Sequence, residues 1–288
     1  MGYQAVQLTE GRVLGVFESG PADGKPIFFF PGFGVSASAV HPDSTLAASI
    51  GVRVISVDRP GIGKSSRSSS RALLDWPRDI AALADRLGID RFGVLGWSGG
   101  GPHALACAFQ LTGRVSVTGL FSCAPPFADA RAVRSMPARV KRLAFVAKFA
   151  PILLRIGFWN HCRQIRKDPD ALLFRSTRDS SEADREIIFD ARFHASLKTS
   201  MIQACNQGPR GLTDDVLVIA HPWGFGLDQV SVPVYLWHAE ADRTIPVEVG
   251  RYLVGAINNC RASFLPGGGH FSYLTHWYEI LQTLAASM

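Results

Sequence analysis

Paired cysteines, a signal peptide and a membrane-spanning run are all missing from this sequence. Its 288 residues include five cysteines, an odd number, widely spaced and without a C-x-x-C pair. This pattern argues against both a disulfide framework and a zinc site. The first ten residues have neither the basic nor the apolar segment of a secretory signal. We therefore expect a cytoplasmic protein with free thiols and no bound metal.

Long apolar runs and strong charge are also lacking. The longest apolar stretch, residues 143–159, is interrupted by Lys148, Pro151 and Arg155 and is too short and too charged to span a bilayer. Apolar residues make up 47% and charged residues 19% of the chain, which is ordinary for a globular enzyme and excludes wholesale disorder. The net charge of +6 is mild and gives no reason to expect nucleic-acid binding.

Short apolar runs alternate with helical periodicity along much of the chain. After a hairpin at residues 5–17, the pattern predicts buried strands at 26–30, 52–57, 92–97, 115–121, 232–238 and 262–265. Residues 72–87, 247–258 and those from about 275 have the spacing of helices. This alternation predicts an α/β protein with a mostly parallel central sheet and helices on both faces.

The alternation lapses between residues 124 and 229. This stretch has only helical and irregular pieces, and its length of roughly a hundred residues far exceeds that of an ordinary connection. We expect a core made of residues 1–124 and 229–288. Residues 125–228 are expected to form a helical cap, inserted after the sixth strand, over one end of the sheet.

One stretch, Gly96-Trp97-Ser98-Gly99-Gly100, joins a predicted strand to an Ala-rich predicted helix. A chain that turns sharply around one serine strains that serine, and glycines two residues before and after it remove side chains that would collide. Such a turn exposes the serine hydroxyl beside the N–H groups of a helix N-terminus. The spacing therefore predicts that Ser98 is a nucleophile.

A serine hydroxyl needs a general base, usually a histidine that a carboxylate holds. His270 lies in a Gly-rich loop after the last predicted strand, and catalytic groups of parallel sheets gather where strands end. We predict that it is the base. His103 follows Ser98 on the same helix and is expected to point away. His238 ends a strand without a catalytic role, and His41 is expected in a loop, with the pocket entrance as a second possibility.

The carboxylate and the oxyanion donors are also expected in loops that follow parallel strands. Asp242 comes after the strand that ends at His238, and we predict that it orients His270; Asp129 is a less favoured substitute, and Glu240 is expected to face solvent. An oxyanion needs fixed N–H donors. These are expected to be the backbone N–H groups of Gly99 and Phe33, with Gly34 as the alternative to Phe33. Gly34 and Trp97 are also candidates for lining the pocket.

These features resemble the α/β-hydrolase superfamily, in which nucleophile, acid and histidine stand in the order of Ser98, Asp242 and His270. Residues 57–65 are similar to its D-x-x-G-x-G-x-S loop, 239–242 to its G-x-x-D motif and 267–271 to its histidine loop. Pro31-Gly32 stands where many members have His-Gly. The resemblance implies the α/β-hydrolase fold and a cofactor-free serine mechanism. The Phe, Leu and Trp residues of the predicted cap suggest an apolar small-molecule substrate, and the sequence leaves the oligomeric state open.

Three other functions have to be weighed. Residues 58–65 nearly spell a phosphate-binding G-x-x-x-x-G-K-S loop, but Asp58 replaces the first glycine and would place a carboxylate beside the phosphates. Serine rather than aspartate at position 98 favours acyl chemistry on esters, thioesters or lactones, or cleavage of a C–C bond next to a ketone. Some members of this fold keep the triad and serve as ligand receptors or partner-binding proteins, and an intact triad permits this as well.

The start of the predicted cap is basic. Residues 131–167 hold ten Lys and Arg and no Asp or Glu, interleaved with large apolar residues. One interpretation is a helix pair with an apolar underside over the pocket and a solvated basic top. The other is a basic amphipathic surface that meets anionic lipid or an acidic acyl carrier.

Overall fold

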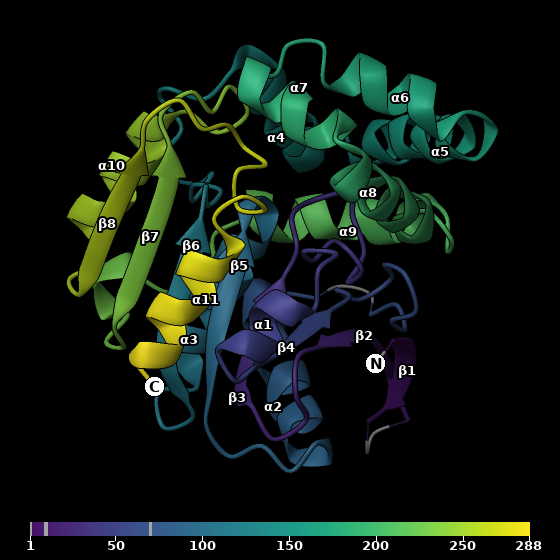
Figure 1. Ribbon diagram of the computed structural model, residues 1–288. Helices are drawn as coiled ribbons and strands as arrows, with labels where there is room; N and C mark the ends of the chain where they lie inside the picture. Colours follow the sequence, from purple (N-terminus) through teal and green to yellow (C-terminus); the bar gives the residue numbers. More distant parts are fainter. Residues whose placement is uncertain (1, 9–10, 69–70) are drawn as a thin grey trace.

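The central sheet follows the alternation of the sequence. The computed structural model describes residues 2–8, 11–68 and 71–288. Within them, eight strands form one sheet in the order β1-β2-β4-β3-β5-β6-β7-β8 (Figure 1). β1 and β2 pair antiparallel, β2 pairs antiparallel with β4, and the strands from β4 to β8 across the sheet are parallel. The strands are β1 (Tyr3–Gln7), β2 (Val13–Ser19), β3 (Lys25–Phe30), β4 (Val52–Val57), β5 (Phe92–Trp97), β6 (Val115–Phe121), β7 (Val234–Ala239) and β8 (Cys260–Leu265).

Helices cover both faces of this sheet, which is why its inner strands are apolar runs and not alternating patterns. The middle strand β3 shows this directly: Phe28 packs edge-on against Phe92, and Phe29 packs against Trp277, with ring centroids 4.8 and 5.1 Å apart. One face carries α2 (Trp76–Arg86), α3 (Gly101–Gln110) and α10 (Val247–Ala256), and the other carries α1 (Thr45–Ser49) and α11 (Trp277–Ala286). The predicted fold class is confirmed.

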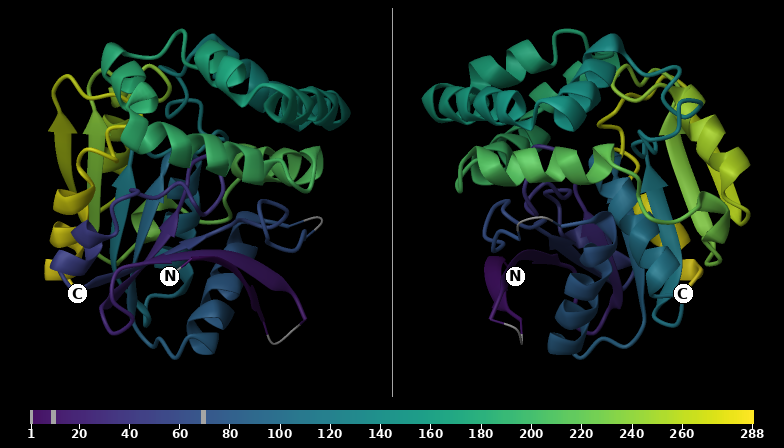
Figure 2. Two further views of the ribbon diagram at one scale, coloured as in Figure 1. Left: turned by 45° about the vertical axis from the view of Figure 1, so that its right-hand side comes forward. Right: turned by 180° about the vertical axis from the view of Figure 1, so that it is seen from behind.

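Further helices fill the segment between β6 and β7, where the alternation lapses. They are α4 (Ala138–Phe149), α5 (Pro151–Lys167), α6 (Pro169–Ser176), α7 (Glu182–Phe189), α8 (Ala191–Ala204) and α9 (Pro209–Ala220). Figures 1 and 2 show them as a layer across the ends of the strands to which the strand arrows point. A buried apolar cluster joins α5 and α9 to the loop after β4 through Ile62, Phe158 and Leu212. The division into a core and a cap at residues 124 and 229 stays a prediction.

Two further observations concern the cysteines and membrane-spanning helices. All five cysteines are free, and all but Cys260 are buried. Among the described residues, no helix has both the length and the apolar character needed to cross a membrane.

Candidate active site

The turn around Ser98 has the strained geometry that its glycines predict. Ser98 follows β5 directly and has a φ of +53°, in the left-handed region that non-glycine residues avoid. A Cβ added to Gly96 would lie 2.6 Å from the carbonyl oxygen of Gly100, and one added to Gly100 would collide with the carbonyl oxygen of Phe30. Only glycine fits at both positions, so the local sequence dictates this turn.

The structure brings Ser98, His270 and Asp242 together from three separate loops. His270 Nε2 lies 2.9 Å from Ser98 Oγ, and His270 Nδ1 lies 2.7 Å from Asp242 Oδ2. The other carboxylate oxygen of Asp242 accepts hydrogen bonds from the N–H groups of Thr244 and Ile245, at 2.7 and 2.9 Å. All members of this triad are more than nine-tenths buried. The result is one continuous hydrogen-bonded line from carboxylate to hydroxyl.

The charges of the triad support each other. Burial by itself would lower the pKa of His270, but the charge and hydrogen bond of Asp242 outweigh it, and the pKa of His270 is raised above its usual value. Burial opposes ionisation of Asp242 in turn, yet the contact with His270 keeps the pKa of this carboxyl below its usual value. An imidazole in this setting is stabilised when it takes up a proton, while the carboxylate stays ionised.

Two side chains fix the loop that carries His270. The indole N–H of Trp97 donates to the carbonyl oxygen of His270 at 2.9 Å, and the Trp97 ring is buried beneath this loop. Asp184, at the start of α7, accepts a hydrogen bond from the N–H of Phe271 at 2.8 Å and is fully buried. Its negative charge also favours protonated His270. That Trp97 lines the pocket stays a prediction. The contact of Asp184 with this loop could not be predicted from the sequence, because Ser181-x-x-Asp184 indicates no more than the start of a helix.

The two predicted oxyanion donors lie next to each other. The loop after β3 passes over the serine turn, and a Cβ added to Gly99 would lie 3.3 Å from the backbone nitrogen of Phe33. Among the described residues, the Phe33 N–H has no hydrogen-bond partner. Gly34, the alternative donor, has a φ of +80°, and a Cβ placed on it would meet open space. An oxyanion role for these groups stays a prediction.

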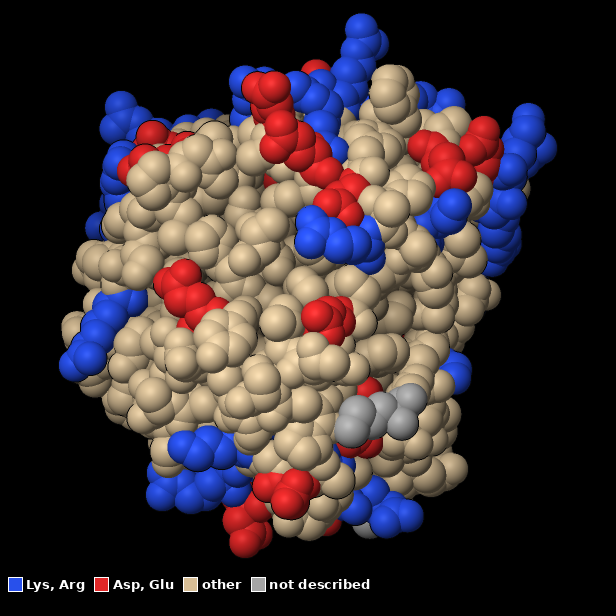
Figure 3. Space-filling view, in the orientation of Figure 1, with Lys and Arg blue, Asp and Glu red and all other residues tan. Residues whose placement is uncertain are grey.

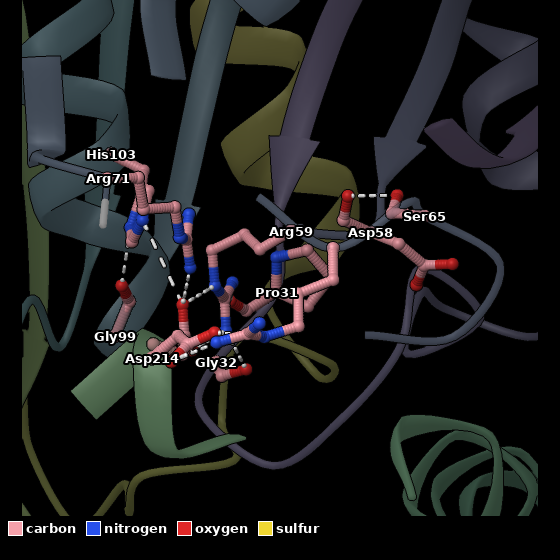
Figure 4. Close-up of polar contacts among 11 residues, drawn as sticks. Pro31, Gly32, Asp58, Arg59, Ser65, Arg71, Gly99, His103 and Asp214 are labelled. Atoms are coloured by element: carbon pink, nitrogen blue, oxygen red, sulfur yellow. Dashed lines mark hydrogen bonds and ion pairs between the residues drawn. The ribbon is translucent and has the colours of Figure 1, made fainter. Parts of the chain in front are cut away.

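A buried ionic cluster holds the loop after β3, which carries Phe33, in place (Figure 4). The guanidinium of Arg59, which follows β4, donates to the carbonyl oxygens of Pro31 and Gly32. It also donates to both carboxylate oxygens of Asp215 on α9, at 2.7 and 2.9 Å, and Arg71 donates to the same carboxylate at 3.1 Å. The exposed fraction of each charged side chain is 3% or less. Through Arg59, a helix of the inserted segment is therefore tied to the loop that carries Phe33.

His103 belongs to this cluster and not to the triad. Its Nδ1 lies 3.0 Å from the carbonyl oxygen of Gly99, and its Nε2 lies 4.0 Å from a carboxylate oxygen of Asp215. Burial, together with the nearby charge of Arg59, lowers the pKa of His103 to about 3. The ring packs edge-on against Trp76, with centroids 5.7 Å apart. His103 is thus a neutral, packed histidine at neutral pH, in agreement with its predicted direction away from Ser98.

The ionisation of Asp215 makes the stability of the fold depend on pH. Burial would raise the pKa of Asp215, but the guanidinium groups of Arg59 and Arg71 and the hydrogen bonds from Arg59 outweigh it, and the pKa is lowered to about 2. A carboxyl with a lower pKa in the folded state stabilises the fold above its unfolded value, which is about 3.9. This contribution is lost as the pH falls from about 4 toward 2.

Removing the charge of Asp215 is expected to weaken the fold. Asp215→Asn leaves Arg59 and Arg71 buried without a counter-charge, so we expect the free energy of unfolding to fall by about 3–5 kcal/mol. Urea denaturation at neutral pH, followed by tryptophan fluorescence, measures this change. The matched control is Asp214→Asn on the same helix, since the partner of Asp214, Arg67, is 38% exposed and such pairs contribute about 0–1 kcal/mol. Equal losses in the two variants would contradict the prediction.

The remaining candidates lie outside the triad. Asp129 accepts hydrogen bonds from Tyr252 and Arg131 and lines an open cavity of about 1120 Å³ whose wall includes no triad residue. Glu240 is exposed, as expected. His238 is buried, and its Nε2 lies 2.8 Å from the carbonyl oxygen of Ile245, in the loop that carries Asp242.

His41 and Asp58 have structural contacts. The ring of His41 packs edge-on against Phe193 of α8, with centroids 5.3 Å apart, and burial lowers its pKa. Asp58 is buried and accepts hydrogen bonds from the N–H groups of Ala37 and Lys64 and from the hydroxyl of Tyr3. Within residues 58–65, the N–H of Lys64 is bonded to Asp58 and those of Gly61, Ile62 and Ser65 to carbonyl oxygens of the same loop, so these groups are not offered to a phosphate.

The sequence and the fold define the class of protein. The family model described as alpha/beta hydrolase fold matches residues 25–276. The chain belongs to this family, and the resemblance read from its motifs is confirmed.

Its relatives differ in the reactions that their names state. The chain is 23% identical over 274 residues to the bifunctional esterase/perhydrolase of Acinetobacter calcoaceticus, covering 94% of this chain and 93% of that protein. It is 25% identical over 241 residues to a 2-hydroxy-6-oxononadienedioate/2-hydroxy-6-oxononatrienedioate hydrolase of Klebsiella pneumoniae, covering 78% and 73%. A solved thermophilic esterase from Thermogutta terrifontis superposes with a TM-score of 0.71 at 19% identity, covering 98% of this chain and 97% of that one. At this identity the structural likeness shows the fold alone.

Proposed function

We propose that the protein hydrolyses a carboxylic ester, thioester or lactone of an apolar small molecule through an acyl-enzyme on Ser98. The observation that carries the proposal is the hydrogen-bonded line from Asp242 through His270 to Ser98 at a strained serine turn. A serine held in this way is activated by the adjacent base, and the strain fixes its hydroxyl in a single direction.

The mechanism uses groups of this chain alone. As Ser98 Oγ attacks the carbonyl carbon, His270 Nε2 takes its proton, and Asp242 stabilises the imidazolium. The N–H groups of Gly99 and Phe33 bind the developing oxyanion. His270 then gives its proton to the leaving alcohol or thiol. In the second half, His270 takes a proton from water, which attacks the acyl group, and the acid is released as Ser98 regains its proton.

An apolar substrate fits the surroundings of the site. Phe158 on α5 lies against Phe33 of the oxyanion loop, with ring centroids 5.4 Å apart, so apolar side chains of the inserted helices meet the site directly. Ser98 has an exposed fraction of 8%. A substrate group at this serine is therefore largely removed from water, which favours ligands without strongly hydrated groups.

Hydrolysis of a C–C bond is a second candidate, because one relative is named for a hydrolase of 2-hydroxy-6-oxo acids. The same triad can serve this reaction, so the distinction lies in the substrate. A triad-retaining ligand receptor or partner-binding protein is the non-enzymatic alternative.

A series of p-nitrophenyl esters from acetate to decanoate, combined with a fluorophosphonate probe, tests the proposal. We expect turnover with an optimum of chain length and covalent labelling that peptide mass analysis places on Ser98. Labelling without turnover on any ester of the series would contradict hydrolysis of simple esters and favour the C–C reaction. The absence of both labelling and turnover would contradict a hydrolase and favour the receptor.

A further inference from the structure

The outer side of α4 and α5 presents large apolar side chains to solvent. Their exposed fractions lie between 55% and 65%, whereas such residues are usually buried or exposed one at a time. We call this surface the α4–α5 face. Its apolar members are Phe145, Phe149, Ile152, Leu153, Ile156 and Trp159.

Packing within the chain does not explain this face. Helix α5 has one apolar stripe, through Leu154, Phe158 and Ile165, that is buried in the cluster shared with α9. A second stripe, through Ile152, Ile156 and Trp159, runs along the opposite side at the same helical spacing and is exposed. A helix that is apolar on both sides needs cover on both. The described part of the chain covers only one of them.

Cations stand among these apolar side chains. The guanidinium of Arg163 lies 5.7 Å from the ring centre of Trp159, and the ammonium of Lys148 lies 5.3 Å from that of Phe149. All ten charged residues between 131 and 167 are Lys or Arg. Figure 3 shows Lys and Arg projecting at the upper right edge of the molecule, where Figure 1 places α5.

We propose that the α4–α5 face binds the surface of an anionic lipid membrane. Such a surface is negatively charged at its headgroups and apolar just beneath them. It can accept the Phe, Ile, Leu and Trp side chains at the headgroup–acyl boundary, and its phosphates can pair with Lys and Arg at the same depth. Trp159 is of the residue type that favours this boundary.

Charge argues against a second copy of the chain as the occupant. A two-fold interface would place the α4–α5 face against itself. Residues 131–167 contain no carboxylate, so cations would meet cations. An acidic protein would match the charge, and the test below separates it from lipid.

Membrane binding would place lipid beside the site. The inner side of α5 carries Phe158 against the oxyanion loop, while its outer side carries Trp159. A single helix thus separates the proposed membrane surface from the loop of Phe33. Binding itself does not depend on the proposed function, since none of the triad residues lies on this face.

Co-sedimentation of the full chain with vesicles tests the proposal. We expect binding to phosphatidylcholine vesicles that contain phosphatidylglycerol, weak binding to phosphatidylcholine alone, and a loss of binding as salt is raised. Ser98→Ala is expected to bind as the wild type does, so a failed catalytic proposal leaves this result unchanged. Equal binding to both vesicles at low salt, or binding to neither, would overturn the proposal.

Matched variants locate the binding surface. Arg155→Glu/Arg163→Glu and Phe149→Ser/Trp159→Ser are each expected to weaken partitioning at least about tenfold. The control for charge is Arg86→Glu/Arg91→Glu, both exposed near the end of α2, and the control for apolar area is Tyr278→Ser on α11. Circular dichroism verifies that each variant is folded. If the control variants weaken binding as much as the variants on the α4–α5 face do, this face is not the binding site.

Two further measurements exclude the other occupants. Light scattering without lipid reports the oligomeric state, and a dimer that the Phe149→Ser/Trp159→Ser change dissociates would overturn the proposal in favour of a second copy. Retention on an immobilised acyl carrier protein, without binding to either vesicle, would overturn it in favour of an acidic partner.

Discussion

Ser98→Ala is expected to lower kcat on the best p-nitrophenyl ester by about 10⁶-fold, because the acyl-enzyme can no longer form. The residual rate would come from substrate binding and the oxyanion donors. The measurement is steady-state hydrolysis by wild type and variant in parallel, together with loss of fluorophosphonate labelling. This is the largest effect that the proposed mechanism implies.

A matched control exists within the same site region. Ser122 follows β6, is buried and also has a positive φ, +44°. Among the described residues its hydroxyl has no hydrogen-bond partner, so Ser122→Ala removes a similarly strained serine without breaking a polar contact. We expect near-native rates from this variant. If Ser98→Ala retains a rate comparable with Ser122→Ala, the proposed nucleophile is wrong.

Asp242→Asn is expected to lower kcat by about 10⁴-fold, because the amide neither stabilises the imidazolium nor holds the productive tautomer of His270. The pH profile supplies a second readout. Hydrolysis requires neutral His270, so the wild-type rate falls as the pH drops through its raised pKa. Without the carboxylate, burial acts unopposed by this partner and lowers the pKa of His270. The acid limb of the residual kcat/KM should therefore move to lower pH.

Glu240→Gln serves as its control, since Glu240 lies two residues before Asp242 and its side chain is exposed. This variant removes the same charge from the same loop without touching the imidazole, and we expect an unchanged acid limb. A limb that moves to higher pH in Asp242→Asn would mean that this aspartate does not stabilise protonated His270. An unchanged kcat would remove it from the mechanism.

The positions of the strands along the chain and of the turn at Ser98 could be predicted from the sequence, because both depend on local sequence patterns. Buried parallel strands require continuous apolar runs, and the runs at residues 26–30 and 92–97 became β3 and β5. The turn at Ser98 depends on glycines two residues away, whose missing side chains decide the backbone by themselves. The proximity of His270 and Asp242 could be predicted for a related reason: the loops after neighbouring parallel strands open on the same edge of the sheet.

Tertiary structure alone decided the contacts that support this site. Arg59 and Asp215 are 156 residues apart and meet only because α9 folds back over the loop after β3. Asp184 reaches the histidine loop from α7 in the same way. No spacing or periodicity along the chain predicts such contacts, because the charged residues that form them are far apart in the sequence and become neighbours only when the chain folds.

The α4–α5 face shows, within one segment, what the sequence determines and what only the tertiary structure decides. The sequence determined that residues 131–167 are basic and rich in apolar side chains, because composition needs no structure to be read. Which of the two apolar stripes of α5 would be covered depended on the docking of α9. Docking buries one side of a helix and leaves the other to solvent, so only the fold could assign Phe158 to the site and Trp159 to the surface.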